Sequence, residues 1–106
     1  MLRQADEKNS KDRHYLGMSW RVAFSSDALK FLARNSVSEE AITEKVAEAI
    51  RMFQGERVNI QIKKLGGQWE GFYRIRRGRV RIIVEFQFED SIAYIERIDW
   101  RGNAYK

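Results

Sequence analysis

The chain has 106 residues, 43% of them hydrophobic and 12% aromatic, which suits one small domain with a modest core. It has no cysteine and a single histidine, His14, so it lacks a thiolate nucleophile and the ligands of a usual zinc site. No apolar run is long enough for a transmembrane helix or a secretory segment. We therefore expect a cytoplasmic protein that uses no cofactor and no metal and does not associate with membranes.

The net charge of +5 is distributed unevenly along the chain. Residues 1–56 carry nine Lys/Arg and nine Asp/Glu, whereas residues 57–106 carry eleven Lys/Arg and six Asp/Glu. The whole excess thus lies in the part whose apolar residues have the period of β-strands. A basic sheet indicates a polyanion or an acidic partner protein, and the charge alone does not distinguish them.

The chain begins with a polar segment. Residues 1–17 lack periodicity, so we expect a disordered N-terminal extension, followed by a single domain over residues 18–106. Met18 directly precedes the first periodic segment and is a candidate for the true start.

The first expected strand is 19–24, where apolar and polar residues alternate. The segment 25–27, Ser-Ser-Asp, offers N-caps for a helix over about 27–34.

A second helix is expected to begin at Ser36, which fits a capping box with Glu39, or at Ser38. Gly55 is a suitable residue to end it. An apolar stripe at helical spacing indicates packing against a sheet, and it consists of Ile42, Val46, Ile50 and Phe53.

From Val58 onward the apolar residues recur at every second position, which predicts strands at about 58–63, 69–76, 79–88 and 91–100. Short turns join these strands, so they are expected to pair antiparallel. The predicted fold class is α+β in the order β-α-α-β-β-β-β, with an N-terminal strand, a two-helix hairpin and an antiparallel sheet. The helices should cover one face of the sheet and leave the other exposed.

The segment YRIRRGRVRIIVEF, residues 73–86, predicts a β-hairpin that turns at Arg77-Gly78. Four arginines are expected to pair across it and to share the exposed face, Arg76 with Arg79 and Arg74 with Arg81. Like charges opposite each other destabilise a sheet, so this pattern indicates an anion from outside the chain. The alternative is a solvated face neutralised by Glu70, Glu85 or Glu96.

The segment from Leu65 to Ile83 resembles the signature hairpin of the RelE/ParE superfamily, toxins of bacterial type II toxin–antitoxin systems. The ending Arg101-Gly102-Asn103-Ala104-Tyr105 is similar to that family's closing motif, an Arg followed four residues later by Tyr. The resemblance spans about residues 18–106 and implies a RelE-like fold. In the RelE arm, which enters the ribosomal A site and cuts mRNA, the functional motif positions correspond to Arg74, Arg76, Arg81, Arg101 and Tyr105.

The tail tyrosine favours the RelE arm over the ParE arm, which poisons DNA gyrase. Two departures from the family pattern bear on proton transfer: the first-strand positions, often lysine in the ribonuclease arm, are both arginine, and Trp100 stands where relatives often have histidine. Arginine is effectively always protonated, so it clamps phosphate but is a poor proton donor. Three hypotheses stay open: a ribosome-dependent mRNA endoribonuclease, a ParE-like gyrase inhibitor that cuts no RNA, and a non-toxic basic module that binds RNA or protein.

The resemblance implies metal-independent cleavage, in which the 2′-hydroxyl of RNA attacks the adjacent phosphate. We expect Arg81 and Arg101 to clamp that phosphate. Tyr105 is the candidate base if nearby arginines lower its ordinary pKa of about 10, or else a stacking surface for a base. Trp69 and Trp100 are expected to pack at the rim or in the core rather than to serve as base-stacking platforms. Neighbouring phosphates are assigned to Arg74, Arg76, Arg79, Lys63 and Lys64. The alternatives for the two lysines are the missing acid of the reaction or, more simply, ordinary strand-end residues.

The resemblance also implies partners. These are a cognate acidic antitoxin that wraps the toxin, mRNA on the ribosome, and operator DNA contacted only through the antitoxin.

Overall fold

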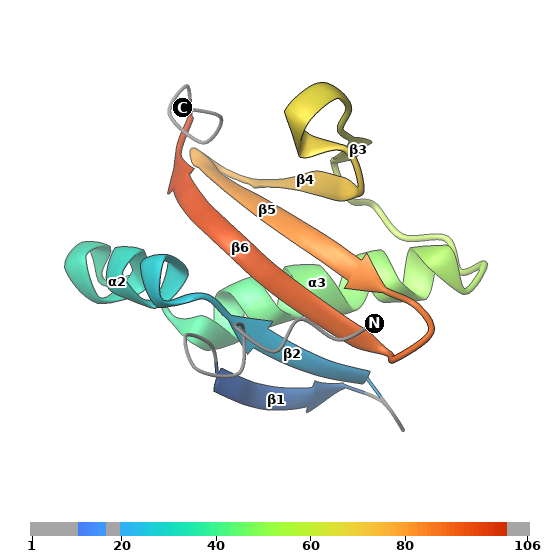
Figure 1. The fold of residues 1–106 in the computed structure, drawn as a ribbon, viewed down its shortest axis with the longest axis horizontal. Coiled ribbons are helices and arrows are strands. Elements are labelled where there is room, and N and C mark those ends of the chain that lie inside the picture. Colours follow the sequence, from blue (N-terminus) through green and yellow to red (C-terminus); the bar gives the residue numbers. More distant parts are fainter. Residues whose placement is uncertain (1–10, 17–19, 102–106) are drawn as a thin grey trace.

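The computed structural model describes residues 11–16 and 20–101. Their elements are strands β1 (Lys11–Leu16) and β2 (Trp20–Phe24), helices α2 (Ser26–Asn35) and α3 (Glu39–Phe53), strand β3 (Ile62–Lys64), the 3-10 turn η1 (Gly67–Trp69), and strands β4 (Phe72–Arg77), β5 (Val80–Gln87) and β6 (Ile92–Trp100). The six strands form one sheet in the order β1-β2-β6-β5-β4-β3 (Figure 1). The predicted α+β class and the predicted order of elements are confirmed.

The sheet is mixed. Strands β3, β4, β5 and β6 pair antiparallel, as their short connections predict, but β2 pairs parallel with β6, from Arg21 opposite Ile92 to Phe24 opposite Ile95. A parallel pair needs a long connection between its strands, and here both helices and three further strands supply it.

Strand β1 lies within the segment where the sequence predicts disorder, so that prediction is wrong for Lys11–Leu16. The strand pairs antiparallel with β2, and its register shifts between Asp12 and His14. The edge of β2 would otherwise present unpaired N–H and C=O groups, which a passing segment can satisfy through its backbone. Backbone pairing leaves no side-chain period, so the sequence pattern did not predict it. Residues 1–10 and 17–19, including Met18, lie outside the described residues.

Ser25 begins α2 and also ties it to the sheet. Its Oγ accepts a hydrogen bond from the Ala28 N–H at 3.0 Å and donates to the Glu96 carbonyl at 2.7 Å. The predicted N-cap segment is therefore confirmed. Its hydrogen bond to Glu96 also fixes the start of α2 against β6.

Ser38 begins α3, since its Oγ accepts a hydrogen bond from the Ala41 N–H at 3.1 Å. Ser36 has φ +55 and ends α2, and its N–H bonds the carbonyl of Leu32. The predicted capping box of Ser36 with Glu39 is wrong, because a residue in the left-handed conformation that closes one helix does not cap the next.

The core lies between the two helices and one face of the sheet. Figure 1 shows α3 crossing behind β5 and β6. The predicted stripe of Ile42, Val46 and Ile50 is buried there, and each such side chain contributes about 1.5–3 kcal/mol through its burial. On the sheet side the largest members of the cluster are Phe24, Ile75, Ile82, Val84, Phe86, Ile95 and Ile98.

Neither described helix is long and apolar enough to cross a membrane.

Candidate functional site

The β4–β5 hairpin turns at Gly78-Arg79, one residue later than predicted. Gly78 has φ +59, the left-handed conformation that a two-residue hairpin turn with glycine at its first central position requires. The glycine thus selects its own place in the turn, and the predicted register is wrong by two residues. The observed pairs are Arg76 with Arg81 and Arg74 with Ile83, in place of Arg76 with Arg79 and Arg74 with Arg81.

A shift of two residues keeps every side chain on its face, because the strand period is two. Arg74, Arg76 and Arg81 therefore share the face away from the helices, as predicted. Arg79 leaves the strand and lies exposed in the turn.

Arg81 is buried, with 5% of its surface exposed, so the expectation that its face is open to solvent is wrong at this position. Its Nη1 donates to the carbonyls of Gly78 at 2.8 Å and Val80 at 3.2 Å. Across the sheet it lies opposite Asp99 of β6. A guanidinium carries several donors in a rigid plane, which suits it to bind two backbone carbonyls at the turn at once. This geometry supports a positioning role, and phosphate clamping by Arg81 stays a prediction.

Two exposed arginines lie together beyond this buried one. The Arg101 N–H donates to the Arg79 carbonyl at 2.7 Å, which joins the chain after β6 to the hairpin turn. Arg79, Trp100 and Arg101 line a cavity of about 350 Å³.

On the other side of the turn lies a second basic cavity of about 660 Å³. Arg76 and Arg77 line it together with Lys45 of α3. The Arg76 N–H donates to the Gln61 carbonyl at 3.0 Å, so the segment before β3 forms one wall.

We call the four arginines around the turn the basic tip, namely Arg76, Arg77, Arg79 and Arg101. Among residues 20–101, none of these four guanidinium groups forms an ion pair. Cations that the fold leaves unneutralised attract anions from solution.

The remaining predicted residues lie apart from the basic tip. Lys63 and Lys64 are exposed on β3, and Lys63 pairs with the half-buried Arg74. They form a separate basic strip at the β3 edge of the sheet. Tyr105 lies outside the described residues.

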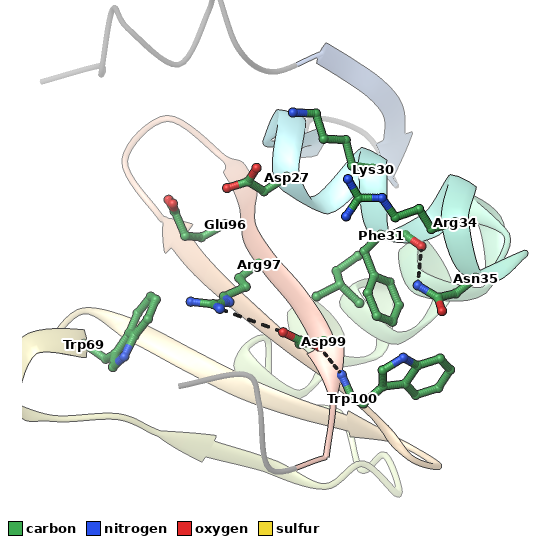
Figure 2. Close-up of a pocket in the computed structure, with 11 residues that line it drawn as sticks. Asp27, Lys30, Phe31, Arg34, Asn35, Trp69, Glu96, Arg97, Asp99 and Trp100 are labelled. Atoms are coloured by element: carbon green, nitrogen blue, oxygen red, sulfur yellow. Dashed lines mark hydrogen bonds and ion pairs between the residues drawn. The ribbon is translucent and has the colours of Figure 1, made fainter. Parts of the chain in front are cut away.

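A third cavity, of about 500 Å³, opens between α2 and β6, and Trp100 also lines it (Figure 2). It exists because β2 pairs only with Ile92–Ile95, so the second half of β6 has no strand on that side. Acidic and basic side chains alternate in it, as in the Arg97–Asp99 ion pair at 3.8 Å. This mixture does not favour a polyanion. Its charged residues are Asp27, Lys30, Arg34, Glu96, Arg97 and Asp99.

Two tryptophans were expected only to pack. Trp69 does pack, edge-on against Phe72 at 5.5 Å. Trp100 packs edge-on against Phe31 at 5.2 Å, yet 39% of its surface is exposed. Its position directly before Arg101 was the available signal in the sequence, and it lies at the basic tip.

Within the described part of the chain, no group of three or more His, Cys, Asp or Glu side chains could hold a metal ion.

No protein-family model matches the sequence, and no curated protein matches it. Solved structures do match. The archaeal RelE–RelB complex from Pyrococcus horikoshii OT3 is 27% identical over 82% of this chain and 100% of the matched chain, with a TM-score of 0.54. The RelBE2 toxin–antitoxin complex from Mycobacterium tuberculosis is 23% identical over 79% of this chain and 100% of the other, with a TM-score of 0.53.

The YoeB–YefM complex from Staphylococcus aureus is 15% identical over 79% of this chain and 99% of the matched chain, with a TM-score of 0.54. The chain therefore has the fold of the RelE and YoeB toxins, and the predicted resemblance to the RelE/ParE superfamily is confirmed.

Proposed function

We propose that this chain, which has the fold of RelE and YoeB toxins, is the toxin of a type II toxin–antitoxin system and cuts mRNA on the ribosome. The observation that carries the proposal is the basic tip, where Arg79 and Arg101 are joined by a 2.7 Å backbone hydrogen bond and stay exposed. A small fold that leaves several arginines without ion pairs among residues 20–101 is suited to a phosphate backbone. The activity belongs in the cytoplasm, where translated mRNA is.

The proposed reaction is a phosphoryl transfer within the RNA chain. The 2′-oxygen forms a bond to the adjacent phosphorus while the bond to the 5′-oxygen breaks. The products are a 2′,3′-cyclic phosphate and a free 5′-hydroxyl. Negative charge builds up on the phosphorane, and guanidinium groups held in place before the reaction stabilise it. Arg101 and Arg79 are both exposed and adjacent, so we assign them to this purpose.

Proton transfer is assigned separately, because arginine keeps its proton. We assign to Tyr105 the role of base that takes the proton of the 2′-hydroxyl, and the departing 5′-oxygen takes its proton from water. We assign to Arg81 the task of holding the Gly78-Arg79 turn in place, through its two carbonyl contacts. Arg74, Lys63 and Lys64 on the β3 side would contact phosphates farther along the strand.

The proposal includes a protein partner. The matched toxins were crystallised in complexes named for RelB and YefM. We propose that an acidic antitoxin binds this chain as well and that any contact with operator DNA is made by the antitoxin. Co-purification with the product of a small acidic reading frame beside the gene is the expected result. Failure to co-purify with any such product would contradict this part.

The test is induced expression of the chain in bacteria, with growth and the 5′ ends of transcripts followed together. We expect growth arrest and new 5′-hydroxyl ends within translated codons. Arg101→Ala and Tyr105→Phe should each relieve both effects. Arg51→Gln on α3 is the matched control, since Arg51 is exposed and pairs only with Glu56 at 3.7 Å, and it should stay toxic.

Growth arrest with intact transcripts would contradict cleavage. If supercoiling by purified gyrase were then inhibited, the chain would be assigned to the ParE-like alternative. Absence of growth arrest would point to the non-toxic basic module.

A further inference from the structure

Trp100 is placed as a binding surface rather than as part of the core. It is the last residue of β6, and in the described part of the chain only Trp100 and Phe88 are large hydrophobic residues that are exposed, at 39% and 51%. An exposed indole at the end of a central strand has no structural need to be aromatic.

The indole is nevertheless held firmly. The backbone of Trp100 pairs with Val80 across the sheet, and its backbone N–H donates to Asp99 Oδ1 at 2.7 Å. Its ring meets the buried ring of Phe31 at 5.2 Å with an interplanar angle of 62°. One edge is thus anchored on α2, and the ring has little freedom to lose when a ligand binds.

Trp100 lines one cavity together with two cations, and it also lines the mixed-charge cavity beside α2. Arg79 and Arg101 line the same cavity of about 350 Å³, and their backbones are joined at 2.7 Å. Neither guanidinium has an ion-pair partner among residues 20–101. An aromatic face beside exposed arginines matches one nucleotide of a single strand, with the base on the ring and its flanking phosphates on the arginines.

We propose that Trp100 is the stacking platform for one unpaired base of the bound RNA, with Arg79 and Arg101 on the phosphates beside it. The inference rests on the proposed function, since it names a subsite of the same RNA site. It adds that the site selects single-stranded RNA, because a base must leave its own stack to lie on the indole. Every base has an aromatic face, so the contact is tolerant of sequence.

The test uses a short oligouridine whose 2′-hydroxyls are methylated, so that it binds without being cut. Trp100→Ala should weaken its binding about 5- to 100-fold, the usual loss for one stacked base. Trp100→Phe should recover most of the affinity. Phe88→Ala, which removes the other exposed aromatic residue, should leave it unchanged.

Two further measurements separate stacking from a general loss of structure. The dependence of affinity on salt should be the same for Trp100→Ala and the original chain, whereas Arg79→Gln should lower the logarithmic slope by about 0.7. An oligonucleotide that is fully abasic should bind Trp100→Ala and the original chain equally well. The same equality is expected for a duplex made by adding the complementary strand.

Equal binding of oligouridine by Trp100→Ala and the original chain would overturn the stacking assignment and leave the proposed RNA site standing. The stacking assignment would also be overturned if Trp100→Ala bound the abasic strand more weakly than the original chain does. If Trp100→Ala does not fold, the comparison uses Trp100→Leu and Trp100→Phe. Weaker binding by a folded Trp100→Leu than by Trp100→Phe supports stacking. Equal binding by these two variants overturns it. Absence of binding by the original chain would overturn this inference, whereas the proposed cleavage on the ribosome stands or falls by the 5′ ends of transcripts.

Discussion

The two ends of the β4–β5 hairpin are stabilised by different interactions. At the open end, Phe86 packs against Phe53 at 5.0 Å and against Tyr73 at 5.6 Å, with both ring pairs edge-on. At the turn, a buried arginine donates to the Gly78 and Val80 carbonyls instead. One end is stabilised by apolar burial and the other by a charged group bonded to backbone.

The difference separates stability from function within one hairpin. Apolar rings gain free energy from leaving water, so the aromatic end needs no ligand. At the turn, burying Arg81 satisfies the carbonyls and lets Arg79 remain exposed. The fold thus uses one arginine as structure, while Arg79 beside it stays exposed.

Phe86→Ala should have the largest effect on stability. Phe86 is 6% exposed and lies in the ring cluster, so its truncation should lower the free energy of unfolding by about 3–5 kcal/mol. Urea denaturation followed by circular dichroism measures it. Phe88→Ala is the matched control and should have a much smaller effect, since Phe88 is half exposed. Similar losses for the two variants would show that the aromatic end is not a packed cluster.

Arg81→Ala should come next, with a loss of about 1.5–3 kcal/mol, the range for hydrogen bonds to charged groups. The same urea titration measures it, with Arg51→Ala on the surface of α3 as the control expected within about 0.5 kcal/mol. If Arg81→Ala abolished RNA binding at unchanged stability, Arg81 would be a phosphate ligand and its positioning role would be lost.

Gly78→Ala tests the turn itself. A Cβ at this position meets nothing within 4 Å, so the expected loss of about 1–2 kcal/mol comes only from the left-handed φ of +59. Gly66→Ala is the control, because that site is equally open and its φ is −132. Thermal melts of the two variants should therefore differ. Equal melting temperatures would contradict the turn geometry.

Arg79→Gln should have the smallest effect on stability, within about 0.5 kcal/mol, because the side chain is exposed and only its carbonyl is bonded. Its effect should appear in RNA binding, measured by fluorescence anisotropy over a salt series. A destabilisation as large as that of Arg81→Ala would erase the distinction between the two arginines.

The sequence was sufficient for most of the elements, β1 excepted, and insufficient for the contacts between them. Apolar period and serine caps predicted both helices and the four later strands, because these signals are local. The hairpin register depended on which side of Gly78 the turn falls, and a single glycine fits either choice until its φ is known. The burial of Arg81 could not be predicted, because its side chain bonds the Gly78 carbonyl and the predicted turn lies one residue too early.

The cavities could not be predicted for a related reason. The space beside β6 arises where β2 ends its parallel pairing with β6. The residue pattern of β2 does not indicate which strand it pairs with. Trp100 was predicted to pack because tryptophan usually does, and its exposure became evident only once β6 was found to end at the hairpin turn.

The parallel pairing of β2 with β6 has a consequence for how the chain is made. Strand β6 lies in the middle of the sheet, between β2 and β5, yet it is the last of the described strands to be synthesised. Until Ile92–Trp100 has emerged, β2 has no sheet neighbour on that side and the hairpin has no link to α2. Contacts between segments so distant in sequence form slowly. The growing chain therefore assembles its basic tip last, after the final strand joins the two parts of the sheet.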